Sequence, residues 1–87
     1  MRVLVIKLGA LGDFVQAFAA FRTIREAHAD AQITLLTTRP YADLAAASGL
    51  FDHIDADGRP KGLVQTLRLF ARLRAARFDR VYDLQTS

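Results

Sequence analysis

The residues with chemical potential cluster near the N-terminus, in the segment Lys7-Leu8-Gly9-Ala10-Leu11-Gly12-Asp13. Its two glycines allow a tight backbone turn and leave space for a ligand to approach. The lysine can bind an anionic group, and the carboxylate can act as a general base toward a substrate hydroxyl. Asp13 is therefore a candidate catalytic residue, and Lys7, Gly9 and Gly12 are candidate binding residues.

Asp13 also has a purely structural interpretation. Aspartate is a preferred helix N-cap, and Asp13 with Gln16 three residues later has the spacing of a capping box. A carboxylate engaged in capping is less free to accept a proton. The spacing alone favours the cap, and it leaves the general base as the alternative.

Three polar residues follow the last apolar run of the chain. Asp83, Gln85 and Thr86 come after a predicted strand and should open onto the same edge of the sheet as Asp13. We add Gln85 to the predicted binding residues. The alternative is a chain end without a functional role.

The glycine segment partly matches two nucleotide-binding motifs. The dinucleotide motif G-x-G-x-x-G is incomplete because Lys7 occupies the place of its first glycine, and Arg39 stands near the expected acidic ribose ligand. An NADP-type site therefore stays only as an alternative. A P-loop is excluded because no lysine follows Gly12.

The composition is that of one small globular domain. The chain has 87 residues, 52% of them hydrophobic, with 12 basic and 9 acidic side chains. The absence of cysteine excludes disulfide scaffolds, thiolate zinc sites and cysteine nucleophiles. His28 and His53 are too far apart for a metal motif, so we expect neither a metal nor a cofactor. The N-terminal apolar run is interrupted by Lys7 and is too short for a signal peptide, which favours the cytoplasm.

Basic residues are concentrated in the second part of the chain. Residues 1–57 hold 5 basic and 7 acidic residues, whereas residues 58–87 hold 7 and 2. Arg68 and Arg72 lie one turn apart on a predicted helix, where they could attract lipid headgroups or sugar phosphates or simply face solvent. Phe70 is the one aromatic residue between these arginines, too few for a stacking surface, so we expect no nucleic-acid partner.

Apolar runs and helical periodicities alternate along the chain. The run over 3–6 has no polar interruption and predicts a strand buried on both faces. Apolar residues at spacings of three and four predict a helix over 13–28. The further predictions are a strand over 33–37, a helix begun by Thr38 and Pro40 and ended at Ser48-Gly49, a short strand within 52–56, a turn over 57–60, a helix over 63–78 and a strand over 80–84.

This order predicts an α/β fold with a doubly wound, Rossmann-like parallel sheet. With the strand order 3-2-1-4, ligands would bind beside the end of the first strand, and the fourth strand would be an exposed edge. Such domains usually have five or six strands, so about four strands indicate an incomplete domain.

Three segments resemble one known family. Residues 1–13 are similar to the start of the ADP-heptose:lipopolysaccharide heptosyltransferases, glycosyltransferase family 9, and residues 33–38 and 78–85 are similar to that family's second and fourth strands. The resemblance implies a GT-B architecture of two Rossmann-like domains. Residues 1–87 would then be part of the N-terminal acceptor-binding domain, and the donor-binding domain would be absent.

The resemblance also implies a function. The parent enzyme would move heptose from an ADP-sugar, with inversion, to the anionic lipid A-core acceptor of lipopolysaccharide, at the cytoplasmic face and in peripheral contact with the inner membrane. Asp13 would be the base, and Lys7, Gly9, Gly12 and Gln85 would form the acceptor site. Without the C-terminal domain that holds the donor, we expect the 87-residue chain to be inactive. The alternatives are a non-catalytic remnant or interaction module that pairs through its fourth strand and, less favoured, an NADP-type dinucleotide-binding domain.

Overall fold

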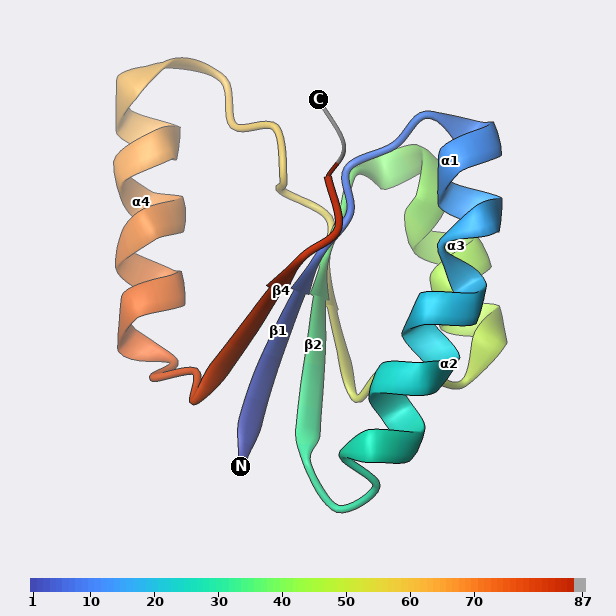
Figure 1. The fold of residues 1–87 in the computed structure, drawn as a ribbon. Coiled ribbons are helices and arrows are strands. Elements are labelled where there is room, and N and C mark those ends of the chain that lie inside the picture. Colours follow the sequence, from blue (N-terminus) through green and yellow to red (C-terminus); the bar gives the residue numbers. More distant parts are fainter. Residues whose placement is uncertain (86–87) are drawn as a thin grey trace.

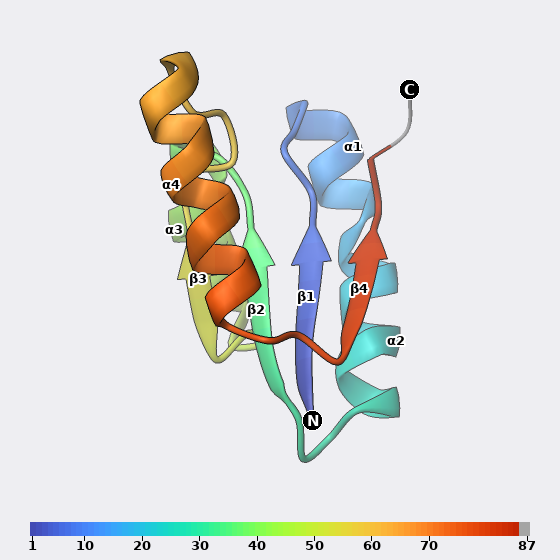
Figure 2. The ribbon, with the colours of Figure 1, turned by 90° about the vertical axis from the view of Figure 1, so that its left-hand side faces the viewer.

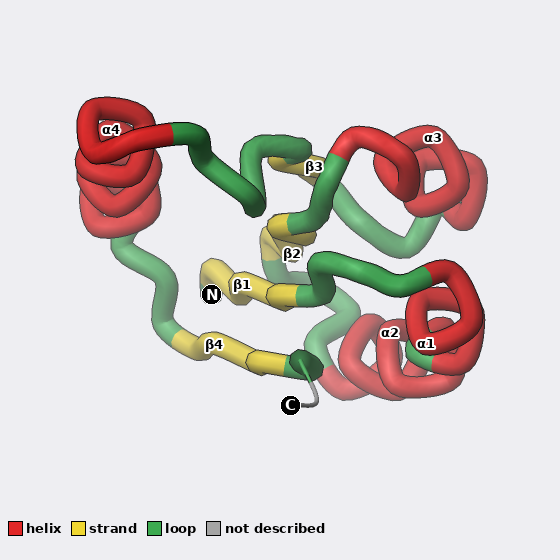
Figure 3. Tube along the Cα trace, turned by 90° about the horizontal axis from the view of Figure 1, so that it is seen from above, coloured by secondary structure: helices red, strands yellow, loops and turns green. Residues whose placement is uncertain are grey.

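The structure is a computed structural model that describes residues 1–85, and it confirms the predicted parallel α/β fold. Four parallel strands have the order β3-β2-β1-β4, as predicted (Figure 1). Seen from above, α1, α2 and α3 cover one face of the sheet and α4 covers the other (Figure 3). The elements are β1 (Arg2–Ile6), α1 (Leu11–Gln16), α2 (Phe18–Ala27), β2 (Gln32–Leu36), α3 (Arg39–Ser48), β3 (His53–Asp55), α4 (Gly62–Ala75) and β4 (Arg80–Asp83).

The central strand β1 is buried on both faces. Val3 and Val5 belong to the core under α1–α3, whereas Leu4 belongs to the core under α4. All three side chains are at most 3% exposed. A strand covered on both sides has no position for a polar residue, which explains its uninterrupted apolar run.

Aromatic rings fill the core between the sheet and α1–α3. Phe14 and Phe21 are almost fully buried. The Phe14 ring stacks on Tyr41 of α3 with 4.9 Å between centroids, and Phe18 and Phe21 meet it edge-on at 5.6 Å. These contacts fix the short α1 against α2 and α3.

The helix predicted over 13–28 differs from the observed one in two respects. The observed helix begins earlier, at Leu11. It is also interrupted at Ala17, whose N–H donates hydrogen bonds to the carbonyl oxygens of both Asp13 and Phe14. Shared hydrogen bonds of this kind are common at helix ends. The sequence pattern places the start at Asp13 because Gly12 disfavours a helix interior, whereas the first turn of the observed helix tolerates it.

The core under α4 is much smaller. It consists of Leu4, Leu36 and Leu69, with Leu73 and Phe78 packed against them. The helix predicted to reach residue 78 ends at Ala75, and Arg77 adopts a left-handed φ of 53°. Leu69 is the one fully buried side chain of α4, and Figure 2 shows the helix standing in front of β3 and β2 at one side of the sheet.

Arg25 of α2 connects the helix layer to the strands. Its guanidinium donates to Asp52 Oδ2 at 2.9 Å, and the same oxygen accepts the Ile33 N–H at 2.8 Å. The hydrogen bond from Ile33, and then that from Arg25, lower the pKa of Asp52. Further acceptors of the guanidinium are the backbone carbonyls of His28, Ala29, Ala31 and Leu50.

Replacing Asp52 should therefore produce a pH-dependent loss of stability. A carboxyl whose pKa is lowered on folding stabilises the fold above its ordinary value of 3.8, and this contribution is lost as the pH falls through the lowered value. Asp52→Asn should unfold at a lower urea concentration than the parent at pH 7. The two midpoints should converge in acid, below pH 3.8. Asp43→Asn, which removes an exposed charge on α3, is the matched control, and an equal loss in both variants would contradict the role of Asp52.

Candidate functional site

A shallow depression of about 250 Å³ lies where β1 and β4 end. The connection from β1 to β2 runs over one face of the sheet, and that from β3 to β4 runs over the other (Figure 3). The β1–β4 boundary is therefore the topological switch point, the usual ligand position in open α/β sheets. The lining residues are Lys7, Asp13, Gln16, Ala17, Ala20 and Leu84.

Asp13 lies in the first turn of α1 with its side chain exposed. The capping-box interpretation is wrong, because α1 begins at Leu11 and its N-cap is Ala10, with no side-chain cap. Among residues 1–85, no hydrogen bond or ion pair engages the Asp13 carboxylate. Asp13 therefore lines the depression, and its carboxylate has no structural task among the described residues beyond a favourable interaction with the helix dipole.

Lys7 lines the same depression. It is only 3% exposed, so it is not a solvated lysine at a strand end. Its Nζ donates to the backbone carbonyl of Leu84 at 3.1 Å. In the described part of the chain it forms no ion pair with Asp13. An ammonium group has three donors, so it keeps hydrogens for a ligand.

The backbone between Lys7 and Ala10 is held from neighbouring strand ends. The Leu8 N–H donates to Gln85 Oε1 at 2.7 Å, and Leu8 O accepts from Thr38 Oγ1 at 2.9 Å. Gln85 therefore contacts the glycine loop, and it does not line the depression. Thr38 is the predicted N-cap of α3, but its hydroxyl serves this loop instead of capping. Thr86 lies outside the described residues.

The two glycines of the loop have different roles. Gly9 has a φ of +130°, and a Cβ on it would lie 2.5 Å from Cε2 of Tyr41. Gly12 is part of α1, and a Cβ there would meet nothing within 4 Å. We expected the backbone to require glycine at both positions, but it does so only at Gly9. Gly12 leaves open space beside Asp13.

A second, larger pocket of about 580 Å³ lies on the α4 side, where β2 and β3 end. Only Asp57 is acidic among its lining residues, and Arg72 pairs with Asp55 at 3.0 Å and with Asp57 at 3.4 Å. The sequence analysis singled out Arg39, Arg68 and Arg72 one by one. It could not predict that they line one pocket, because this depends on how the turn over 57–60 folds. The basic lining residues are Arg39, Arg59, Lys61, Arg68 and Arg72.

The described residues offer no metal centre and no membrane-spanning helix. Within residues 1–85, no three histidine or carboxylate side chains come close enough together to hold a metal ion. None of the helices in this range is both long and apolar enough to cross a bilayer.

Comparison with known proteins points to glycosyltransferases. The chain is 31% identical over 78 residues to a putative glycosyltransferase of Haemophilus influenzae, covering 90% of this chain and 22% of that protein. It is 27% identical over 86 residues to lipopolysaccharide heptosyltransferase 1 of Campylobacter coli, covering 98% of this chain and 25% of that protein. The chain thus spans about a quarter of the length of these relatives. No protein-family model and no solved structure matches it.

Substitution of the two glycines should separate backbone strain from open space. Gly9→Ala should lower the free energy of unfolding by about 2 to 4 kcal/mol, because it adds a strained φ and displaces the Tyr41 ring. Gly12→Ala should leave stability unchanged or raise it by up to about 1 kcal/mol, because alanine is the better helix residue. Urea unfolding of both variants measures the difference. A Gly9→Ala chain as stable as the parent would show that the loop does not have this conformation.

Proposed function

We propose that this chain is the front part of the acceptor-binding domain of an inverting glycosyltransferase, with Asp13 as its catalytic base. The observation that carries the proposal is the exposed Asp13 carboxylate, which no described residue engages and which lines a depression at the β1–β4 switch point. The names of the two relatives support the reaction class. Lys7, Gly9, Gly12 and Gln85 are proposed to form or support the acceptor site.

The proposed chemistry is a single displacement. Asp13 accepts the proton of an acceptor hydroxyl, and the oxygen attacks the anomeric carbon of the donor sugar. The bond between that carbon and the donor's phosphate oxygen breaks on the opposite side, so the nucleotide leaves and the configuration inverts. The Lys7 ammonium, fixed by Leu84 O, would hold an anionic or hydroxyl group of the acceptor beside the carboxylate.

The finer assignment concerns the two substrates. The name of the Campylobacter coli relative supports heptose as the transferred sugar and lipopolysaccharide as the product. The basic pocket beside α4 suits an anionic acceptor such as the lipid A-core, because five cations line it against one carboxylate. The ADP-sugar donor is proposed to bind a second domain outside these 87 residues.

An NADP-type dinucleotide site is the second candidate. Arg39, the first residue of α3, lines the basic pocket, where a 2′-phosphate could be held. The diphosphate would have to lie at the start of α1, a helix of only six residues with the Asp13 carboxylate in its first turn. Two anions in that position repel each other, so we favour the glycosyltransferase.

Neutralising Asp13 should abolish most of the transfer activity of a full-length protein that carries this segment. Asp13→Asn should lower kcat by about a hundredfold or more, because the amide cannot take the acceptor proton. The measurement is release of ADP, or mass-spectrometric detection of the extended acceptor. Thermal unfolding is the control, since the loss of stability should stay below about 1 kcal/mol if Asp13 contributes only to the helix dipole. Turnover close to that of the parent would contradict the assignment of the base.

The isolated 87-residue chain should show no turnover with an ADP-sugar and acceptor. A base without a positioned donor lacks the advantage of proximity, which supplies roughly 7 to 11 kcal/mol in favourable cases. The same transfer assay tests this expectation, with the full-length protein as the positive control. Catalytic turnover by the isolated chain would contradict the need for a second, donor-binding domain.

A further inference from the structure

Gln16 at the end of α1 is the one glutamine whose side chain has no structural task in the part of the chain that the structure describes. The chain contains four glutamines. In the other three, the side-chain oxygen lies 2.7 to 3.0 Å from a hydrogen-bonding nitrogen; they are Gln32, Gln65 and Gln85. The capping box that the sequence spacing gave to Gln16 does not form, because α1 begins at Leu11. Its amide is therefore uncommitted, like the Asp13 carboxylate.

Gln16 shares its surroundings with Asp13. The two residues are three positions apart on α1, a spacing that makes them neighbours on the helix surface. Both side chains are exposed, and both line the depression at the β1–β4 switch point. A carboxylate accepts hydrogen bonds, whereas an amide both donates and accepts them. Two hydroxyl groups on neighbouring carbon atoms of a ligand match such a pair of side chains.

The lining of the depression suits an uncharged ring that carries hydroxyl groups. Half of the lining residues are polar, namely Lys7, Asp13 and Gln16, and half are apolar, namely Ala17, Ala20 and Leu84. The charges of the lysine and the aspartate are opposite and balance each other. Sites for small molecules combine an apolar lining with a few polar groups that fix orientation. A sugar ring offers C–H groups to the one and hydroxyl groups to the other.

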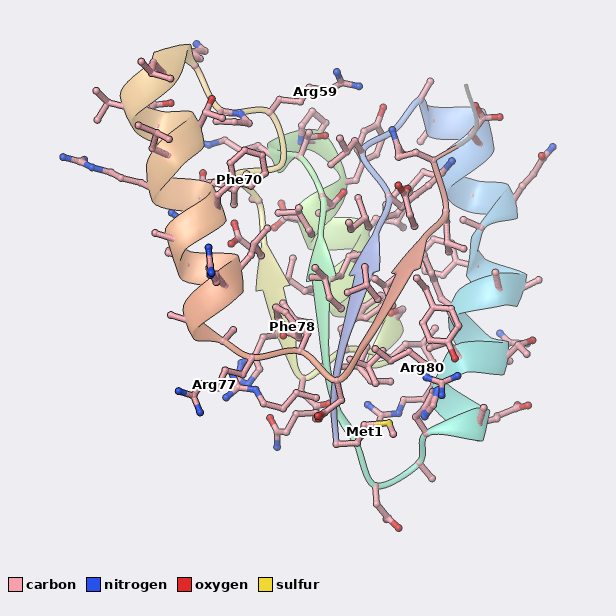
Figure 4. The ribbon with its side chains drawn as sticks, turned by 60° about the vertical axis from the view of Figure 1, so that its left-hand side comes forward. Met1, Arg59, Phe70, Arg77, Phe78 and Arg80 are labelled. Carbon is pink, nitrogen blue, oxygen red and sulfur yellow. The ribbon has the colours of Figure 1, made fainter. Side chains whose placement is uncertain are left out.

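The basic pocket differs in its charge. Five cations line it against the single carboxylate of Asp57. Figure 4 shows Arg59, one of these cations, on the connection that leads into α4, whereas α1 belongs to the helix layer on the other face of the sheet. The two sites therefore suit different parts of a substrate, anionic groups in the basic pocket and neutral hydroxyl groups in the depression.

We propose that Gln16 determines which acceptors the depression accepts, by binding the hydroxyl next to the one that Asp13 deprotonates. The amide nitrogen donates to the oxygen of this second hydroxyl, or the amide oxygen accepts its hydrogen. The depression then selects a ligand with two adjacent hydroxyl groups. The role in sugar transfer rests on the proposed function, whereas binding of a diol rests on the two side chains alone.

Binding can be followed by NMR in the 87-residue chain. Four glutamines and no asparagine give only four pairs of side-chain amide signals. The probes are cis-1,2-cyclohexanediol, which has two adjacent hydroxyl groups on an apolar ring, and cyclohexanol, which has one. At millimolar concentrations the diol should shift the amide signals of Gln16 and leave those of Gln32 and Gln65 in place. It should bind about threefold to tenfold more tightly than cyclohexanol, the range of one neutral hydrogen bond.

Substitution of Gln16 should remove this preference. Gln16→Ala should bind the two alcohols equally, because the amide that distinguishes them is gone. Val15→Ala is the matched control, since Val15 is 53% exposed on the same helix but does not line the depression, and it should keep the preference. Alanine favours a helix at both positions, and the same spectra report folding. Unshifted Gln16 signals, equal binding of both alcohols by the parent, or a preference retained in Gln16→Ala would overturn the proposal.

Kinetics of a full-length protein that carries this segment separate the two proposals. Gln16→Ala should raise KM for the acceptor by about threefold to tenfold and change kcat by less than about twofold, because the amide binds its hydroxyl equally in the ground state and the transition state. Asp13→Asn should instead lower kcat. An unchanged KM in Gln16→Ala would overturn the role of Gln16 and leave the base intact. If the parent protein catalysed no transfer, the proposed function would fail, and the diol measurement would still decide what Gln16 binds.

Discussion

The left-handed backbone at Gly9 is the constraint on which the candidate site depends. A side chain there would strike the Tyr41 ring, and that ring is itself stacked on Phe14, the residue after Asp13. Because Phe14 is fully buried, the start of α1 is fixed relative to α3 and the sheet. The exposed Asp13 carboxylate is thus placed by the aromatic core beneath it and by the turn that only glycine permits.

A buried lysine completes this arrangement. An ammonium group removed from water needs hydrogen-bond acceptors, and Leu84 O at the end of β4 supplies one for Lys7. This contact joins the ends of β1 and β4 at the switch point. The depression is consequently lined by a fixed cation and an uncommitted carboxylate, with space beside Gly12.

Much of the fold could be predicted because single periodicities decide it. The uninterrupted apolar run of β1 and the spacing of Phe14, Phe21 and Ile24 identify a parallel sheet and its covering helix. The start of α1 could not be predicted, because Leu11-Gly12 has no local helix signal. The predicted capping role of Asp13 is wrong for the same reason, since it assumes that the helix begins at Asp13. Three features of the site could not be predicted, because they depend on residues distant in sequence. They are the burial of Lys7, the contact of Gln85 with the loop, and the basic pocket, and the distant residues include Leu84, Thr38 and Arg59. The exposure of most large apolar side chains of α4 could not be predicted, because an apolar helix pattern does not show which surface covers it.

The most direct test of the proposed base is a crystal structure of a full-length protein that carries this segment, bound to its acceptor and a non-transferable donor analogue. The account predicts an Asp13 carboxylate oxygen about 2.6 to 3.2 Å from the acceptor hydroxyl, with that hydroxyl facing the anomeric carbon. An acceptor bound elsewhere, or an Asp13 side chain turned away from the reacting hydroxyl with another base in its place, would contradict it.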